Sequence, residues 1–323
     1  MNQPLFVVYD DIYLDWQLGS GDGTHPTNPM RAKLATQMLV SSLGDQAQVI
    51  APTSESSKTR DLAALLATHD EGFVAGTLAG DCSEWQGNRP AMGDAAFAMF
   101  AGTVRGVEAI LAGEAKIVFN PQGAKHHAQF ANASGFCAFN DMAYAAKAFL
   151  AAGLKPLYID WDIHAGDGVH EMLKHTPVPT ISIHHDSTYP RNREMQTMNG
   201  TRGAVHHPEW HSYNFSVLTG DGDDWFKKFI DEAAAIIDDY QPDVILVAAG
   251  ADGHGGASNL AEYAKYTEAG FRYAAEMVAE KANAYSQGRV LIGGAGGYQP
   301  LKETPETWAL VVETIYRNTK KGA

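Results

Sequence analysis

Residues 158–170, YIDWDIHAGDGVH, place three aspartates and two histidines around the end of an apolar run. Asp160, Asp162 and Asp167 would repel one another at the mouth of a strand unless a positive group lay among them. Asp162 and His164 are two positions apart, so an extended backbone directs both side chains to the same side. This spacing indicates a cation site with a carboxylate and an imidazole among its ligands.

Asp252 is the best candidate for a third ligand, because it follows another apolar run, VILVAAG at 244–250. Two carboxylates and one imidazole leave a position open for water or substrate on Zn²⁺, as in catalytic zinc sites. The oxygen-rich set also suits Fe²⁺. Because the carboxylates nearly neutralise the cation, its water is expected to be less acidic than at a three-histidine site. A separate general base is therefore expected.

Histidine is the expected base, and the chain has adjacent pairs at 126–127, 184–185 and 206–207. The pair 126–127 follows an apolar run within a glycine-containing turn, which favours it over the others. The pair 184–185 continues a strand, so at most one of its side chains faces the site. The pair 206–207 lies in a polar stretch and is expected to be solvated. For each histidine, a purely structural role is the alternative.

Tyr298 directly follows a glycine run, GGAGG at 293–297. Glycine lets the backbone approach a ligand closely, so a tyrosine there could donate a hydrogen bond to a developing oxyanion. The alternative is an aromatic side chain that only closes a glycine turn.

The elements that must position these residues alternate along the chain. Apolar runs predict strands at 5–10, 48–52, 116–120, 156–162, 179–185, 244–250 and 289–297. Helical periodicity is found at 29–43, 93–113, 140–153, 223–240, 266–287 and 304–318. Alternation of this kind predicts an α/β fold with a largely parallel central sheet flanked by helices.

No linker divides the chain, so residues 1–323 are expected to form one domain. Two polar stretches without periodicity, 80–95 and 186–213, are expected to be functional loops. Ligands of open α/β sheets bind beyond the carboxyl ends of the strands. The acids, histidines and tyrosine described above all follow strands, which places them at that edge.

The composition limits which classes of binding partner and which cellular compartment are expected. A net charge of -14 argues against nucleic acid or an anionic membrane as a partner. Cys82 and Cys137 are far apart and predict no disulfide framework. The N-terminus lacks the pattern of a signal peptide, and no stretch approaches the roughly 20 apolar residues of a membrane span. A cytoplasmic enzyme is expected, and nothing in the sequence selects an oligomeric state.

Short segments along most of the chain together resemble the histone deacetylase family, including its bacterial acetoin-utilisation relatives. They occur in the family's order and are HPTNPMRAKL (25–34), AGDC (79–82), KHHA (125–128), ASGFCAFND (133–141), DWDIHAGDGV (160–169), SIH (182–184), AGAD (249–252) and GGAGGY (293–298). The resemblance implies the arginase-deacetylase fold and a single deacetylase-like catalytic domain. It also implies zinc-dependent hydrolysis of an acetyl-amide, with acetyl-lysine or a similar acylated amine as substrate.

The resemblance also assigns roles to individual residues. It implies a zinc site of Asp162, His164 and Asp252, and a catalytic pair in which His127 is the general base beside His126. The carboxylates that hydrogen-bond this pair are Asp160 and Asp167, and Tyr298 polarises the scissile carbonyl. The implied substrate channel consists of Phe136, Tyr189, Asp81, Gly135 and Gly296. The implied structural K⁺ site consists of the carbonyls of Asp160, Asp162, His164 and Ile183, with the Ser182 side chain.

Several segments depart from the family pattern. Gly123-Ala124-Lys125 replaces the usual Pro-Gly before the tandem histidines, and Ala295 replaces the third glycine of the glycine run. GHGGASNL follows Asp252, where His254 could approach the metal, and RNREMQTMNG at 191–200 replaces an expected Gly-Thr-Gly. These changes bear on the shape of the channel and on the choice of substrate.

Three alternatives to protein deacetylation stay open. A small-molecule amidohydrolase could act on an acetylpolyamine or a pathway metabolite. An arginase-like ureohydrolase would need a second metal and further aspartates, whereas this chain has HAGDG after Asp162. A non-catalytic binder of acylated amines would have lost the base, a ligand or the tyrosine, and all three are present.

Overall fold

A computed structural model of the chain describes residues 3–19, 25–256 and 263–319. The strands are β1 (Leu5–Val8), β2 (Ala47–Ile50), β3 (Ile117–Asn120), β4 (Pro156–Asp160), β5 (Thr180–His185), β6 (Gly203–His207), β7 (Ser212–Val217), β8 (Asp221–Gly222), β9 (Val244–Ala248), β10 (Ala264–Lys265) and β11 (Val290–Gly293). The α-helices are α1 (Met30–Leu43), α2 (Lys58–Leu66), α3 (Glu71–Leu78), α4 (Pro90–Leu111), α5 (Asp141–Ala151), α6 (Asp167–Leu173), α7 (Asp223–Tyr240), α8 (Glu268–Ala284) and α9 (Glu303–Asn318).

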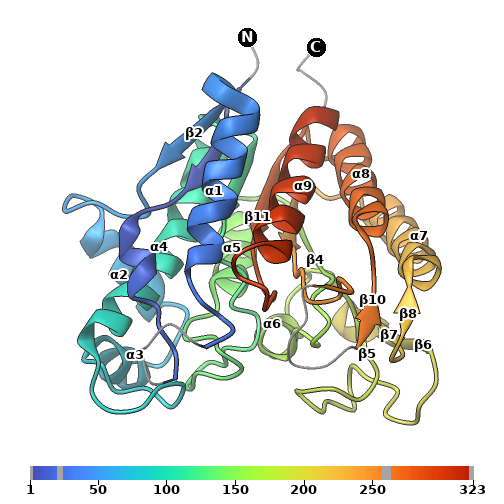
Figure 1. Cartoon of the computed structure of the whole chain (residues 1–323), viewed down its shortest axis with the longest axis horizontal. Coiled ribbons are helices and arrows are strands. Elements are labelled where there is room, and N and C mark those ends of the chain that lie inside the picture. The colour runs from blue at the N-terminus through green and yellow to red at the C-terminus, as the bar shows by residue number, and fades with distance from the viewer. Residues whose placement is uncertain (1–2, 20–24, 257–262, 320–323) are drawn as a thin grey trace.

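Nine of the eleven described strands form one large sheet in the order β2-β1-β3-β11-β9-β4-β5-β7-β6, and β8 and β10 form a separate two-stranded parallel sheet. Neighbouring strands are parallel except for β6, which is antiparallel to β7 at one edge. The predicted α/β class with a largely parallel central sheet is therefore confirmed (Figure 1). All seven predicted strands are present, with ends that differ by a few residues.

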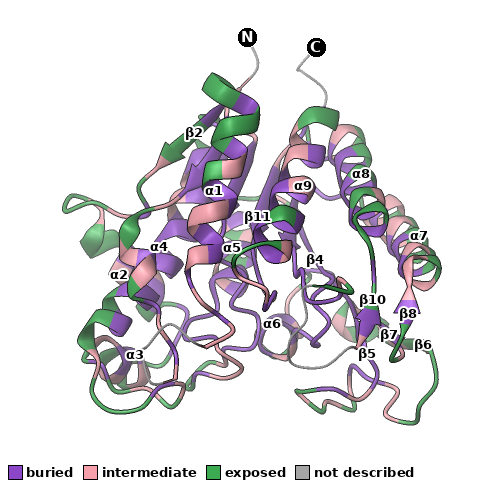
Figure 2. Cartoon of the chain, in the orientation of Figure 1, coloured by how far each residue is buried: buried purple, intermediate pink, exposed green. Residues whose placement is uncertain are grey.

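Apolar side chains on both faces of the strands explain why the sheet is covered on both sides. On β9, for example, Ile245 and Val247 belong to one buried cluster with residues of α1, α7, α8 and α9. Val244 and Leu246, which alternate with them, pack with residues of α4, α5 and α6 on the other face. The central strands are buried along their whole length in Figure 2.

The polar stretch 186–213 is more ordered than predicted. It contains β6, a short 3-10 helix at Pro208–Trp210 and the start of β7. The pair 206–207 lies on the strand β6 rather than in a loop, and the expected exposure to solvent is found for His206 but only partly for His207. His206 is exposed and packs against Phe215, whereas His207 is partly buried and stacks on Trp210. A short edge strand with alternating exposure carries little apolar signal, which is why the sequence missed it.

The helices α2, α3 and α6 were also absent from the prediction, and each has nine or fewer residues. No helix in the described ranges is long and apolar enough to cross a bilayer.

Candidate active site

The site lies where four neighbouring strands end at one edge of the sheet. The strands β3, β11, β9 and β4 are adjacent, and each leads into a segment that carries one of the predicted functional groups. The last residues of these strands are Asn120, Gly293, Ala248 and Asp160. Their parallel direction brings together segments that are far apart in the sequence.

Asp162, His164 and Asp252 are all buried, and one ligand atom from each lies within 4.8 Å of the others. His164 Nδ1 is 2.9 Å from Asp252 Oδ2 and 3.0 Å from Asp162 Oδ1. Two carboxylates and an imidazole that converge in this way are a donor set suited to a divalent cation such as Zn²⁺ or Fe²⁺.

The charges of this group require a positive partner. Burial and the neighbouring charge of Asp162 raise the pKa of Asp252 to about 6. Burial also opposes ionisation of Asp162, but His126 and His164 together hold its pKa well below the usual value. His164 is likewise penalised by burial, yet hydrogen bonds to the two aspartates raise its pKa to about 10. A divalent cation supplies this positive charge more directly than a proton on His164, so the donor set fits a metal ion.

Backbone groups position the two carboxylates. Gly296 N–H donates to Asp162 Oδ2 at 2.6 Å, and Ile163 N–H donates to Asp252 Oδ1 at 3.0 Å. A side chain at Gly296 would overlap with both carboxylates. The glycine at 296 is therefore required by the close approach of its backbone to the candidate metal group.

The tandem histidines each have an acidic partner. His126 Nδ1 lies 2.7 Å from Asp160 Oδ2, and His127 Nδ1 lies 2.7 Å from Asp167 Oδ1. Burial disfavours charge on His126, but Asp160 and Asp162 outweigh it and raise its pKa to about 9. Burial and the positive charge of His126 lower the pKa of His127 to about 4. His127 is thus neutral near pH 7 and can accept a proton.

Two supporting residues were not found from the sequence. Tyr158 Oη donates to Asp160 Oδ2 at 2.6 Å, and Gln129 Nε2 donates to Asp167 Oδ2 at 3.0 Å. Tyr158 is two positions before Asp160 on β4 and shares its side of the strand, which is a signal that could have identified it. Gln129 has no comparable spacing.

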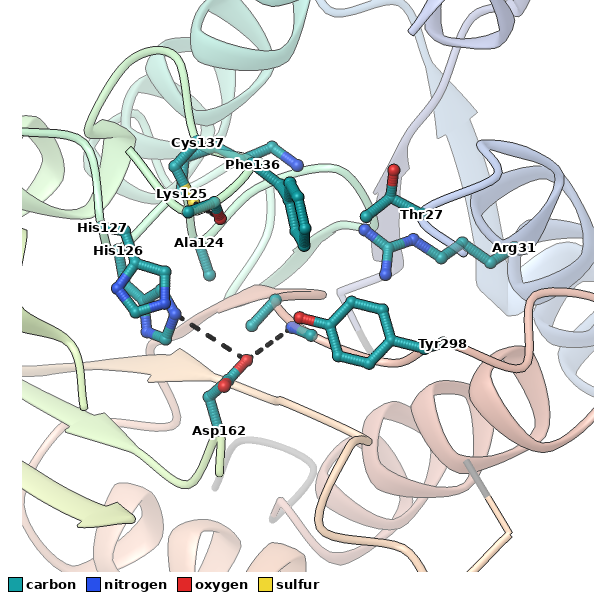
Figure 3. Close-up of a pocket in the computed structure, with 13 residues that line it drawn as sticks. Thr27, Arg31, Ala124, Lys125, His126, His127, Phe136, Cys137, Asp162 and Tyr298 are labelled. Atoms are coloured by element: carbon teal, nitrogen blue, oxygen red, sulfur yellow. Dashed lines mark hydrogen bonds and ion pairs between the residues drawn. The ribbon is translucent and has the colours of Figure 1, made fainter. Parts of the chain in front are cut away.

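Tyr298 faces a pocket that is also lined by His126, His127, Phe136 and Asp162 (Figure 3). The pocket encloses about 320 Å³, counted with its open mouth. Burial and the two metal-site aspartates raise the pKa of Tyr298 well above its ordinary value. The phenol therefore keeps its proton and can donate a hydrogen bond into the pocket.

Of the predicted channel residues, Gly135, Phe136 and Gly296 line the same pocket, whereas Tyr189 and Asp81 are not part of its lining. The ring of Phe136 is 6.4 Å from that of Tyr298, and the ring of Tyr189 is 5.3 Å from that of His127. Tyr189 is half-exposed, and its hydroxyl hydrogen-bonds that of Ser134. Gly135 has a φ of +56°, and a side chain there would overlap with the ring of His127.

Asp81 is exposed in the segment that follows α3. This segment lies beside the channel, because Glu84 Oε2 accepts the Phe136 N–H at 2.6 Å. Glu84 was not singled out from the sequence, and nothing in its spacing marks it.

The other histidines are not part of the metal group. His184 hydrogen-bonds Ser182 Oγ and the Met195 carbonyl, while His185 bonds Thr219. His254 Nδ1 accepts the Gly256 N–H, and its ring stacks on Phe271. The segment 257–262, which continues the departure after Asp252, lies outside the described residues.

The sheet, the metal-type triad and the histidine pair define an α/β protein with a candidate hydrolytic site at the carboxyl edge of its strands. The model of the histone deacetylase domain matches residues 25–315. The chain belongs to the histone deacetylase family.

The similarity to individual relatives extends over different shares of this chain and of each relative. The acetoin utilization protein AcuC of Bacillus subtilis is 28% identical over 312 residues, which are 89% of this chain and 76% of that protein. A probable deacetylase of Archaeoglobus fulgidus is 28% identical over 66% of this chain and 59% of that protein. The type-1 histone deacetylase 1 of Dictyostelium discoideum is 32% identical, but over only 43% of this chain and 28% of its own length.

Proposed function

We propose that the whole chain is one catalytic domain that hydrolyses an acyl-amide, with acetyl-lysine or a similar acylated amine as substrate. The observation that carries the proposal is that His127, Tyr298 and Asp162 line one pocket, and that Asp162 belongs to the metal-type donor set. Family membership supports a hydrolase of the deacetylase type.

Asp162, His164 and Asp252 would hold the metal ion, for which Zn²⁺ is the first choice and Fe²⁺ the second. A divalent cation there would polarise the amide carbonyl and acidify a water molecule. Tyr298 donates a hydrogen bond to the carbonyl oxygen as negative charge develops on it. Asp167 fixes the tautomer of His127 through Nδ1, so that Nε2 is the nitrogen available to the pocket.

The proton balance follows from this arrangement. His127 accepts a proton from the attacking water while the new C–O bond forms. An imidazolium then delivers a proton to the nitrogen as the C–N bond breaks. The products are one carboxylate and one amine, so one water is consumed per amide. His126, held by Asp160 and carrying a raised pKa, keeps a positive charge beside the developing oxyanion.

We also propose a structural K⁺ bound by the carbonyls of Asp160, Asp162, His164 and Ile183 with the Ser182 side chain. Two observations support it. Asp160 and Ser182 are register partners on β4 and β5. The carbonyl oxygens of Asp162 and His164 accept no backbone hydrogen bond from the described residues.

The decisive experiment uses the Zn²⁺-loaded protein and measures acetate release from acetyl-lysine peptides and acetylpolyamines, and urea release from arginine and agmatine. Turnover of an acetylated amine that a chelator abolishes supports the proposal, and the better substrate class separates a protein deacetylase from a small-molecule amidohydrolase. Urea release from arginine or agmatine, or tight binding without acetate release, would reject it.

A further inference from the structure

The pocket beside Tyr298 has a positively charged inner end that the proposed chemistry does not use. Lys125 and Arg31 line it together with the catalytic groups (Figure 3). Asp162, a candidate metal ligand, is the one acid among the described residues of the lining. A bound metal ion would neutralise the charge of Asp162. The ionic groups that remain at this end are then the side chains of Lys125 and Arg31, which are both cations.

Lys125 is 7% exposed, and no carboxylate forms an ion pair with its ammonium among the described residues. Its ammonium lies 3.4 Å from Gln122 Oε1 and 5.6 Å from the centre of the Trp16 ring. The nearby carboxylate of Asp141 accepts instead from the backbone N–H groups of Ala124 and Lys125 and from the Thr103 hydroxyl. Burial and the charge of Arg31 lower the pKa of Lys125 to about 8. No ion pair offsets this buried charge within the described residues.

Arg31 is 3% exposed and also has no acidic partner among the described residues. Its Nη1 donates to the Gly297 carbonyl at 2.6 Å, and its guanidinium lies over the Trp308 ring. Among the described residues, neither its Nε–H nor Nε2 of the buried Gln122 has a hydrogen-bond partner. Buried charges and donors are costly without partners, and an anionic ligand at this end of the pocket would offset that cost.

The direction of the substrate decides which part of it reaches these cations. The carbonyl must lie near Tyr298 and His127, and the amine side leaves towards Phe136 and the exposed Tyr189. The acyl group therefore extends inward, towards Arg31 and Lys125. The methyl group of an acetyl substrate offers no hydrogen-bond acceptor to either cation.

We propose that the inner end of the pocket binds the terminal carboxylate of a dicarboxylic acyl group, so that amides of the malonyl, succinyl or glutaryl type are the preferred substrates. The inference rests on the proposed function, and it narrows the substrate class of the same site. Hydrolysis then follows the same balance, with a dicarboxylate and a free amine as products.

The test compares kcat/KM of the Zn²⁺-loaded protein on one peptide carrying acetyl-, malonyl-, succinyl-, glutaryl- or succinamoyl-lysine. Succinamoyl is the neutral isostere of succinyl. Because hydrogen bonds to charged groups are the stronger ones, the best dicarboxylic substrate should exceed succinamoyl by about 10- to 100-fold. Lys125→Met should remove most of this advantage, measured within the variant as the ratio of kcat/KM on the succinyl and succinamoyl peptides, since Met keeps the length and apolar bulk of the side chain.

Lys147→Met, which changes an exposed lysine on α5, is the matched control and should behave as wild type. Acetyl hydrolysis without any advantage for the charged acyl groups rejects this inference and leaves the proposed function standing. A Lys125→Met variant that weakens only inhibition by free acetate also rejects it, because the cation would then serve the released product. Failure of the wild type on every amide rejects both proposals. The comparison of wild-type substrates needs no variant, so it decides the question even if Lys125→Met does not fold.

Discussion

The imidazole rings of His126 and His127 have centroids 4.0 Å apart, yet the pKa of His126 is raised to about 9 and that of His127 is lowered to about 4. The difference comes from their surroundings. His126 faces the buried carboxylates of Asp160 and Asp162, whereas His127 is next to the positive charge of His126 and has only Asp167 to offset it. Two histidines that are adjacent in sequence are thereby suited to opposite tasks.

Replacement of His127 by Asn should lower kcat by about 10²–10⁴-fold, the usual contribution of a general base. KM should change little, because the imidazole acts on the water rather than on the substrate stem. Steady-state kinetics on the Zn²⁺-loaded variant measure the effect. His206→Asn, at an exposed position of β6, is the control and should retain activity. A His127→Asn enzyme within tenfold of wild type would contradict the assigned role.

Tyr298→Phe removes one hydroxyl from the pocket and keeps the ring. Because an oxyanion donor is typically worth about 10²–10³-fold in rate, kcat should fall by that factor while the thermal midpoint stays close to wild type. Tyr316→Phe, whose hydroxyl faces the Gln3 carbonyl far from the pocket, provides a matched control. Wild-type turnover by Tyr298→Phe would show that the oxyanion is stabilised elsewhere.

Metal binding should be visible in stability as well as in activity. Without a metal ion, a proton on His164 supplies the positive charge between the buried carboxylates of Asp162 and Asp252, and Zn²⁺ would replace it. A ligand present at 100 times its Kd stabilises the native state by about 2.7 kcal/mol. We therefore expect added Zn²⁺ to raise the thermal midpoint of the chelated protein by several degrees, with about one ion bound per chain by elemental analysis.

Asp252→Asn should lose both the bound ion and the thermal response, since a neutral amide is a poor ligand for a divalent cation. Asp231→Asn, at an exposed position of α7, should keep both. Equal Zn²⁺ content in the two variants would show that the ion binds at another place.

The sequence predicted the central sheet well because its strands are apolar on both faces. A run such as VILVAAG has no competing helical interpretation at its length, and a strand there places the next residues of the chain at the sheet edge. Asp162 and Asp252 were paired in this way, and the structure brings them together. The same reasoning could not show β6, because its exposure alternates and its edge pairing depends on β7.

Residues whose importance depends on tertiary contacts were beyond reach of the sequence pattern. Arg31 lies on α1 and reaches the carbonyl of Gly297, a contact across 266 positions that no local spacing predicts. Lys125 was visible as a departure beside the tandem histidines, but its burial depends on Trp16 and Gln122. The roles of Glu84 and Gln129 likewise depend on hydrogen bonds that form only when segments far apart in the sequence meet in the fold.

One further histidine anchors the segment that carries the channel. His69 Nε2 accepts the Asn140 N–H at 2.9 Å, and its Nδ1 lies 3.0 Å from the Gln129 carbonyl and 3.1 Å from that of Phe130. This pattern requires a neutral ring with its proton on Nδ1. Burial accordingly lowers the pKa of His69 to about 4.

This anchor should make the free energy of unfolding depend on pH. Because the folded pKa of His69 lies below the unfolded value of about 6.5, the unfolded state binds more protons between these values. The stabilisation is therefore complete above pH 6.5 and is lost as the pH falls towards 4, by up to about 3 kcal/mol. His69→Gln keeps a donor and an acceptor but cannot titrate, so urea unfolding at pH 4.5 and 7 should show a smaller difference than in wild type. His175→Gln, at an exposed position, should retain the wild-type difference. An unchanged pH dependence in His69→Gln would mean that the ring is not held neutral by these contacts.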